Sequence, residues 1–215
     1  MEEVLFRFLR HGQSEANAGL PTDDHATIAL TELGHAQARD YASGCQAPPQ
    51  RLIVSPFLRA QQTAAPLIER FNLAPETWPI QEFTYLSPQR CVGTTHEQRR
   101  ARVAEYWQHA DPDQIDGPGA ESFHQLIERA DRLLTDLQAL DASGQVLLVG
   151  HGHLMKAVRW RVNGGALRVT SEQMRRFRQR EYTPSIPNCQ GFDVLRTDGR
   201  WVMQSLAITG GPESK

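Results

Sequence analysis

Residues 4–17 read VLFRFLRHGQSEAN, an apolar run that changes abruptly to polar residues. The apolar part contains valine and phenylalanine and predicts a short buried strand. The break at Gly12 and the polar residues after it predict a turn into the start of a helix. A strand that ends where a helix begins presents free backbone N–H groups and the positive end of the helix dipole at one point. Such a point attracts phosphate.

Four side chains around this break suit a phosphate ligand. Arg10 carries a planar fork of donors that matches phosphate oxygens. The imidazole of His11, with an unperturbed pKa of about 6.5, is largely neutral and nucleophilic at neutral pH. Ser14 and Asn17 are three residues apart and are expected on one side of the first helical turn. We therefore treat these four residues as candidate phosphate ligands.

A second segment repeats the arrangement of strand, turn and cation. Residues 51–54, RLIV, predict a short buried strand. Ser55 and Pro56 then predict a helix over 56–71, with serine as its cap and proline in its first turn. This interpretation places Arg59 at the start of the helix, just beyond the end of the strand.

A third segment ends in the same way. Residues 145–150, QVLLVG, are the most apolar predicted strand, and His151 follows directly, before a helix predicted over 154–162. In open α/β sheets, ligands bind beyond the carboxyl ends of the strands. Arg10, Arg59 and His151 are therefore expected to converge on one crevice.

The remaining pattern completes a layered α/β protein in which helices alternate with strands. A helix is expected between a cap at Thr31 and a stop at Gly44, and the Asp198-Gly199 pair predicts a hairpin. The clearest helix has apolar residues at spacings of three and four. The further expected elements are strands over 78–83, 188–196 and 200–207 and helices over 97–109, 122–140 and 171–178.

Glu82 lies near the end of the strand expected over 78–83. If it projects into the crevice beside a phosphate dianion, repulsion between like charges raises its pKa and suits it to donate a proton. The chain then makes an excursion over about 83–119, which is rich in glycine and proline. Its helix either forms a lid over the crevice or packs its aromatic side chains inward. Substrate specificity is expected from this excursion and from residues 168–180.

Composition bounds the remaining possibilities. A chain of 215 residues with 40% apolar residues suits one domain over 1–215 with a sizeable core. The net charge of −2 gives no basic field, so neither nucleic acid nor an anionic membrane is expected as a partner. Three widely spaced cysteines fit reduced thiols in the cytoplasm, and no apolar span of membrane length occurs.

With these residues in hand, the chain resembles the histidine phosphatase superfamily, also called the phosphoglycerate mutase-like family. The resemblance covers most of the chain, and its blocks occur in the family's order. The residues after Glu82 depart from the Glu-x-x-x-Gly pattern of many small members. The matching blocks are residues 9–12 with Ser14 and Asn17, 30–34, 55–64, 119–122 and 149–152.

The resemblance implies a three-layer α/β/α sandwich with a mostly parallel central sheet. It implies a phosphatase that hydrolyses a small phosphomonoester through a phosphohistidine on His11, without metal or cofactor. Glu82 matches the expected position of the proton donor. The further implied site residues are Arg10, Arg59 and His151 around the phosphoryl group and Ser14, Asn17 and Gly152 as substrate-binding residues.

Three other functions stay open at this point. The first is a phosphoglycerate-type mutase, although the chain lacks the extra segments of such enzymes. The second is a metallohydrolase that uses His11, His151, His153 and either Asp23 or Asp24, without any recognisable ligand spacing. The third is a non-catalytic protein that binds a phosphorylated ligand. The sequence also leaves the oligomeric state open, a homodimer included.

Overall fold

A computed structural model describes residues 3–179 and 185–204. They form a six-stranded sheet in the order β3-β2-β4-β1-β5-β6, in which β1, β2, β3 and β4 run parallel and β5 and β6 are antiparallel additions at one edge. The strands are β1 (Val4–Arg10), β2 (Arg51–Val54), β3 (Glu76–Thr77), β4 (Gly144–Gly150), β5 (Gly191–Thr197) and β6 (Arg200–Met203).

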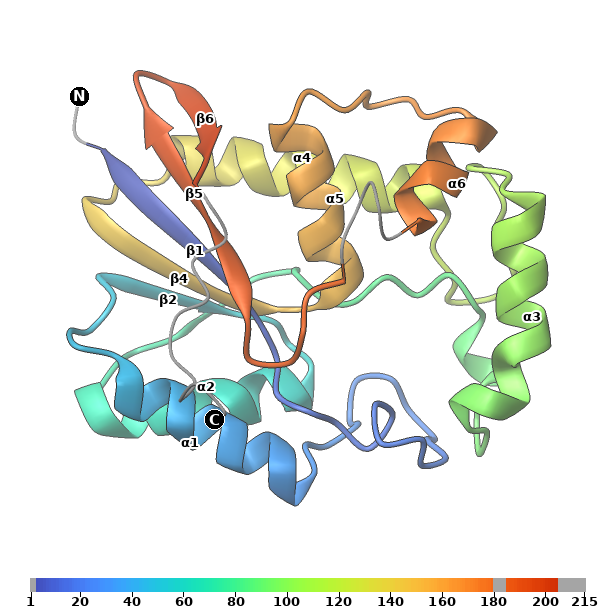
Figure 1. The fold of residues 1–215 in the computed structure, drawn as a ribbon, viewed down its shortest axis with the longest axis horizontal. Helices are drawn as coiled ribbons and strands as arrows, with labels where there is room; N and C mark the ends of the chain where they lie inside the picture. The colour runs from blue at the N-terminus through green and yellow to red at the C-terminus, as the bar shows by residue number, and fades with distance from the viewer. Residues whose placement is uncertain (1–2, 180–184, 205–215) are drawn as a thin grey trace, which may run out of the picture.

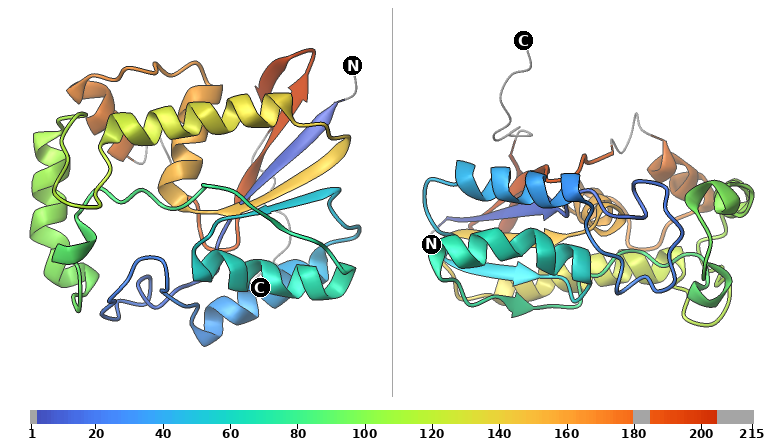
Figure 2. Two further views of the ribbon diagram at one scale, coloured as in Figure 1. Left: turned by 180° about the vertical axis from the view of Figure 1, so that it is seen from behind. Right: turned by 90° about the horizontal axis from the view of Figure 1, so that it is seen from below.

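Helices cover both faces of this sheet, which confirms the expected three-layer arrangement. Figure 1 shows α1 and α2 below the sheet and α4 and α5 above it, while α3 and α6 lie together beyond the strand ends (Figures 1 and 2). The helices are α1 (Glu32–Gly44), α2 (Leu58–Phe71), α3 (His96–His109), α4 (Phe123–Ala139), α5 (Gly152–Val162) and α6 (Ser171–Arg178), with a short 3₁₀ turn, η1 (Pro88–Arg90). Within residues 3–179 and 185–204, every helix is too short or too polar to cross a lipid bilayer.

The parallel register aligns the carboxyl ends of three strands. Arg10 at the end of β1 lies opposite Gly150 at the end of β4, and Val54 at the end of β2 lies opposite Val149. The next residues along the chain, His11, Ser55 and His151, therefore leave the sheet side by side. This alignment confirms that the three strand exits meet at one edge.

The core explains why the helices adopt this arrangement. As predicted, α4 buries a stripe of apolar side chains, and its Ser122 cap accepts a hydrogen bond from the backbone N–H of Gln125. The predicted hairpin also forms, with Asp198 and Gly199 both at positive φ; residues 205–207 of its expected second strand lie outside the described residues. The buried residues of α4 are Phe123, Leu126, Ile127, Ala130, Leu133, Leu134 and Leu137.

The strand expected over 78–83 does not form. Strand β3 is limited to Glu76–Thr77, and the chain then crosses the ends of the other strands without regular structure. Pro79 lacks a backbone N–H and cannot continue a ladder, which explains the early end of the strand. Glu82 consequently lies on a crossing loop instead of at a strand end.

The helix expected after Gly12 does not form either, because residues 13–30 make turns. The backbone N–H of Ser14 donates to Asn17 Oδ1 at 3.3 Å, and that of Asn17 donates to Ser14 Oγ at 3.4 Å. Such local bonds compete with a helical ladder. Ser14 also pairs with Leu30 in an isolated bridge. The backbone beyond β1 is therefore a compact loop.

The helix expected over 56–71 begins two residues later, at Leu58, with Phe57 as a cap that makes no side-chain hydrogen bond. The hydroxyl of Ser55, expected to cap this helix, lies instead 2.8 Å from His151 Nε2. Arg59 remains in the first turn. Other helix boundaries agree with the sequence within two residues, and the excursion helix begins at His96 behind a capping box of Thr95 and Gln98.

Gly34 in α1 holds the loop beyond β1 in place. A Cβ at position 34 would lie 2.0 Å from the backbone oxygen of Gln13, and a Cβ at Gly12 would lie 2.6 Å from the backbone oxygen of Gly34. Because both obstacles are backbone atoms, neither can move aside as a flexible side chain would. The close contact of these glycines sets the position of His11.

We predict that Gly34→Ala lowers the free energy of unfolding by about 1–3 kcal/mol, because the new methyl group overpacks the contact with Gln13. Gly44→Ala at the other end of α1 is the matched control, since nothing lies within 4 Å of a Cβ there. This control is expected to be neutral or to stabilise by about 0.5–1 kcal/mol. Urea unfolding of both variants checks the prediction, and equal effects would contradict it.

Candidate active site

Three buried side chains from separate strand exits meet beyond the sheet. His11 is 3% exposed, Arg59 is 6% exposed and His151 is fully buried. The ring centroids of His11 and His151 are 5.1 Å apart. Arg59 Nε donates a hydrogen bond of 3.3 Å to His11 Nε2. The structure thus brings together residues far apart in the sequence, as the spacing of the strand exits indicates.

The hydrogen bonds of His11 define its tautomer. Its Nδ1 lies 2.6 Å from the backbone oxygen of Gly12. A carbonyl oxygen only accepts hydrogen bonds, so Nδ1 carries the hydrogen and Nε2 keeps its lone pair. The donor from Arg59 on Nε2 agrees with this assignment. Nε2 is therefore the nitrogen of His11 that has an available lone pair.

The surroundings keep this imidazole neutral. Burial, together with the positive charges of Arg59 and Arg10, lowers the pKa of His11 to about 3. A pKa this low leaves the lone pair of Nε2 free of a proton throughout the neutral and mildly acidic range. Neutral His11 can act as a nucleophile without a separate base.

Arg59 and Arg10 are both anchored to backbone oxygens. Arg59 Nη1 donates to the carbonyl of His25 at 2.7 Å, and Arg10 Nη1 donates to the carbonyl of Ile186 at 2.7 Å. Arg10 Nε is buried and has no partner among the described residues. Burial lowers the pKa of Arg59 to about 10 and also lowers the pKa of Arg10. Donors that lack a protein acceptor suit an anion that arrives from solution.

His151 lies under the site at the N-terminus of α5. Its Nε2 lies 2.8 Å from Ser55 Oγ, while its Nδ1 is buried without a partner in the described part of the chain. Burial, Arg59 and His11 lower the pKa of His151 well below its usual value, so the ring is neutral in the free protein. The next residue, Gly152, opens α5, and a Cβ there would lie 3.6 Å from Arg10 Nε.

Ser14 and Asn17 also line the pocket, although they come from a loop and not from the expected helix. Asn188, which sequence analysis did not select, ties this loop to the site. Its Nδ2 donates to the backbone oxygen of His11 at 2.9 Å and to Asn17 Oδ1 at 3.1 Å. Asn188 therefore supports both His11 and the loop.

Glu82 faces the site from the crossing loop. Its Oε1 accepts hydrogen bonds from the backbone N–H groups of Phe83 at 2.9 Å and His153 at 3.0 Å. Its Oε2 lies 3.6 Å from His153 Nδ1. Burial raises the pKa of Glu82, but His153, His151 and the Phe83 N–H oppose this effect, and the net pKa is well below its ordinary value. Glu82 is therefore ionised in the free protein.

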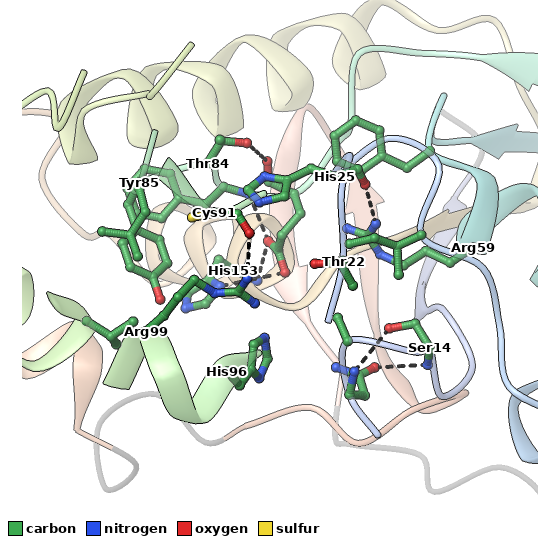
Figure 3. Close-up of a pocket in the computed structure, with 18 of the residues that line it drawn as sticks. Ser14, Thr22, His25, Arg59, Thr84, Tyr85, Cys91, His96, Arg99 and His153 are labelled. Carbon is green, nitrogen blue, oxygen red and sulfur yellow. Dashed lines mark hydrogen bonds and ion pairs between the residues drawn. The ribbon is translucent and has the colours of Figure 1, made fainter. Parts of the chain in front are cut away.

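One pocket of about 360 Å³ is lined by Arg10, His11, Ser14, Asn17, Arg59 and Glu82 among others, while His151 and Gly152 are not part of its lining (Figure 3). The excursion after Glu82 forms its far wall. An isolated bridge between Thr22 and Thr94 joins that wall to the loop beyond β1. Figure 3 shows Arg59 and Ser14 on one side of the pocket and Tyr85 and Arg99 on the other. The pocket has room for a phosphate group and for an organic group attached to it.

Several residues of the site carry no signal that sequence analysis used. Ser55 follows β2 as His11 follows β1, so the repeated strand exit is a signal that could have identified it. Thr63 accepts a hydrogen bond of 3.0 Å from the Gly12 N–H and lies one helical turn after Arg59. Ile186 and Asn188 could not have been found, because they meet the site only through the tertiary fold.

The alternative metal site finds no support in the geometry. Across residues 3–179 and 185–204, no three His, Cys, Asp or Glu side chains lie close enough to share a metal ion. His11 and His151 instead make the hydrogen bonds described above. The set of His11, His151, His153 and Asp23 or Asp24 is therefore not assembled as a ligand cluster.

Known proteins share both the sequence pattern and the fold. The adenosylcobalamin/alpha-ribazole phosphatase of Salmonella typhimurium is 26% identical over 207 residues, which cover 93% of this chain and 96% of that protein. The structure of the alpha-ribazole phosphatase from Shigella flexneri matches with a TM-score of 0.75 at 19% identity over 98% of this chain and 100% of that chain.

A second solved structure, mycobacterial glucosyl-3-phosphoglycerate phosphatase, matches with a TM-score of 0.69 at 23% identity, over 94% of this chain and 97% of that chain. At these identities the two solved structures show the fold alone. The sequence model of the protein family named histidine phosphatase superfamily (branch 1) matches residues 6–209, nearly the whole chain. The chain therefore belongs to the histidine phosphatase superfamily.

Proposed function

We propose that this protein is a phosphatase that hydrolyses a small phosphomonoester through a phosphohistidine on His11, without a metal or another cofactor. The observation that carries the proposal is the neutral His11, whose unprotonated Nε2 lies in a pocket with Arg10 and Arg59. A nucleophile beside two guanidinium groups that form no ion pair with a described carboxylate is suited to attack phosphorus. Membership of the family and the phosphatases among its relatives support the same reaction.

In the first step, His11 Nε2 forms a bond to phosphorus while the bond from phosphorus to the ester oxygen breaks. Arg10, Arg59 and the His151 Nδ1–H donate to the oxygens that carry charge in the transition state. Glu82 takes up the proton that the substrate monoanion brings and passes it to the leaving oxygen, which departs as an alcohol. Ser14, Asn17 and the Gly152 N–H complete the binding of the phosphoryl group.

In the second step, water attacks the phosphorus of phosphohistidine, and the bond to His11 Nε2 breaks. Glu82, now a carboxylate, accepts a proton from the attacking water. Inorganic phosphate is released and His11 returns to its neutral form. Each half-reaction therefore uses the same carboxyl group, once as acid and once as base.

The proposal also covers the domain organisation, the cellular compartment and the partners of the enzyme. We take residues 1–215 to be one catalytic domain, because the excursion over 83–119 closes the same pocket that the strand ends open. The three cysteines are free thiols, which suits the reducing cytoplasm. The partner is a small phosphorylated molecule, with no part for nucleic acid or membrane, and the protein acts as a monomer or a homodimer.

We predict that His11→Ala lowers kcat/KM for para-nitrophenyl phosphate by more than about 10³-fold, because the nucleophile is lost. Rapid quenching of the native enzyme should trap phosphate that is labile to acid and stable to base, and mass spectrometry should place it on residue 11. Label on another residue, or full activity of the variant, would refute the proposed nucleophile. An alkyl phosphate tested beside phosphoglycerate separates hydrolysis from the mutase alternative, and no turnover at all would favour the non-catalytic binder.

We predict that Glu82→Gln lowers kcat for an alkyl phosphate by about 10²- to 10⁴-fold, because an alkoxide needs a proton to leave. Para-nitrophenolate leaves without one, so the same variant should keep much more of its activity with para-nitrophenyl phosphate. Equal losses with the two substrates would show that Glu82 is not the proton donor. Glu121→Gln is a suitable control, since that carboxylate pairs with Arg129 at 2.7 Å.

The pH dependence should follow from the two pKa shifts. Because the pKa of His11 is lowered to about 3, the nucleophile stays neutral from pH 4 upward. Because the pKa of Glu82 is lowered, the proton for the leaving group must enter with the substrate, whose second phosphate pKa is about 6. For an alkyl phosphate, kcat/KM should be level near pH 5 and fall about tenfold per pH unit above that pKa. The fall should flatten in Glu82→Gln; a level profile from pH 5 to 8 in the native enzyme would contradict it.

A further inference from the structure

The wall of the pocket opposite His11 carries a buried cation, Arg99, that has no acidic partner among the described residues. Arg99 on α3 is buried, with 7% of its surface exposed, and it lines the same pocket as Arg59 and Glu82. No carboxylate in residues 3–179 and 185–204 pairs with Arg99. A buried charge is normally compensated by a counter-ion or by strong hydrogen bonds. The positive charge of Arg99 therefore has no counter-ion among the described residues, although the side chain is buried.

The hydrogen bonds of Arg99 use only one end of its guanidinium. Its Nη1 donates to the backbone oxygen of Thr94 at 2.8 Å, to Thr94 Oγ1 at 2.9 Å and to the backbone oxygen of Cys91 at 3.3 Å. No acceptor among the described residues meets its Nε or Nη2. In Figure 3 the side chain extends from α3 toward the middle of the pocket. Two donors on one edge of the fork are therefore available to a ligand.

Arg10 and Arg59 are built in the same way. Each donates through Nη1 to a backbone oxygen, of Ile186 and His25 respectively, and neither forms an ion pair with a described carboxylate. These two arginines are the proposed phosphoryl ligands. Arg99 repeats their construction on the opposite wall, which suggests the same use, the binding of an anion.

Nearby acidic groups do not neutralise this wall. Asp116 lies 2.9 Å from Arg102 and 3.5 Å from Arg90, and Glu97 lies 3.3 Å from Arg100. Glu82, which faces the phosphoryl side, is the one acidic residue among the described residues that line the pocket. The positive charge of Arg99 is therefore available to an anionic group of a ligand that enters the pocket.

The pocket also has apolar lining residues. They include Ile28, Phe57, Leu86 and Val103, and the Tyr85 ring makes tilted contacts with Phe83 and Tyr106. Arg178 adds a further positive charge on the wall with Arg99. Its guanidinium carbon lies 5.2 Å from the centroid of the Trp107 ring on α3. A ligand that fills the pocket therefore meets cations on both walls and apolar side chains as well.

We propose that the substrate carries a second anionic group, a carboxylate or another phosphate, on the part that leaves, and that Arg99 binds this group. The inference rests on the proposed function and names the class of its substrate. The reacting phosphate occupies the wall with Arg10 and Arg59, and the second anion occupies the wall with Arg99. Arg99 is in this scheme a specificity residue, since it lies opposite the reacting bond.

Matched aryl phosphates test the proposal on the native enzyme. We expect 4-carboxyphenyl phosphate to be hydrolysed with a kcat/KM about 10- to 100-fold above that of 4-carbamoylphenyl phosphate, which has the same shape without the charge. The carboxamide has the better leaving group, so a preference for the carboxylate reports binding. The bisphosphate of 1,4-dihydroxybenzene then shows whether a second phosphate is preferred to a carboxylate. A native preference near unity for both anionic compounds would overturn the proposal.

Variants assign the preference to one residue. Arg99→Gln should reduce the carboxylate preference to about unity while retaining hydrolysis of the neutral carboxamide, and Arg99→Lys, which keeps the charge, should retain most of the preference. Arg102→Gln, one turn along α3, removes an equal charge that pairs with Asp116 and should leave the preference unchanged. An unchanged preference in Arg99→Gln, or an equal loss in Arg102→Gln, would refute the assignment.

The outcomes also separate the proposed function from the role of Arg99. If the native enzyme hydrolyses none of the three compounds and forms no phosphohistidine, the proposed function fails. If it hydrolyses the neutral and charged compounds equally through His11, the proposed function stands and only the inference about Arg99 fails. Arg99→Gln also loosens the bonds to Cys91 and Thr94, but loss of that support alone would lower the rates for the neutral and charged compounds together.

Discussion

The alignment of three parallel strand ends is the constraint on which the rest of this structure depends. The pairing of Arg10 with Gly150 and of Val54 with Val149 makes β1, β2 and β4 stop at one edge of the sheet. The residue that follows each strand is polar and lies at that edge: His11 after β1, Ser55 after β2 and His151 after β4. Because most side chains of these strands are buried, the register cannot slip without exposing apolar side chains. The rigid core thus holds Arg10 and Arg59 near each other, although their positive charges repel.

The cost of this arrangement is visible in its electrostatics. Arg10 and Arg59 lie close to His11 without a carboxylate ion pair in the described part of the chain. Burial, reinforced by the charge of Arg59, lowers the pKa of both His11 and His151 and keeps them neutral. The free protein therefore holds an excess of positive charge in a poorly solvated place. In the proposed reaction a phosphate group neutralises that excess, so the charges that bind the substrate also help to keep His11 neutral. Glu82 lines the same pocket, and His153 and backbone N–H donors keep its carboxyl group ionised.

Sequence analysis succeeded where the chemistry is local. The apolar runs identify β1, β2 and β4, and the residue after each run is found without knowledge of the fold. It was wrong where tertiary contacts override local preference. The loop after Gly12 does not become a helix, because it packs between Gly34 and Leu30, and residues 78–83 leave the sheet at Pro79. Glu82 nevertheless lies in the pocket, because the crossing loop runs over the strand ends.

The sequence by itself determined the kinds of groups available: an imidazole after one strand, a guanidinium after a second and an imidazole after a third. It also determined the layered α/β class, because periodicity is a property of consecutive residues. Only the tertiary structure decided which partners those groups meet. Ser55 beneath His151, Asn188 behind His11 and Arg99 across the pocket are contacts between segments distant in the chain. Such contacts depend on how the layers pack, and no local pattern of residues encodes them.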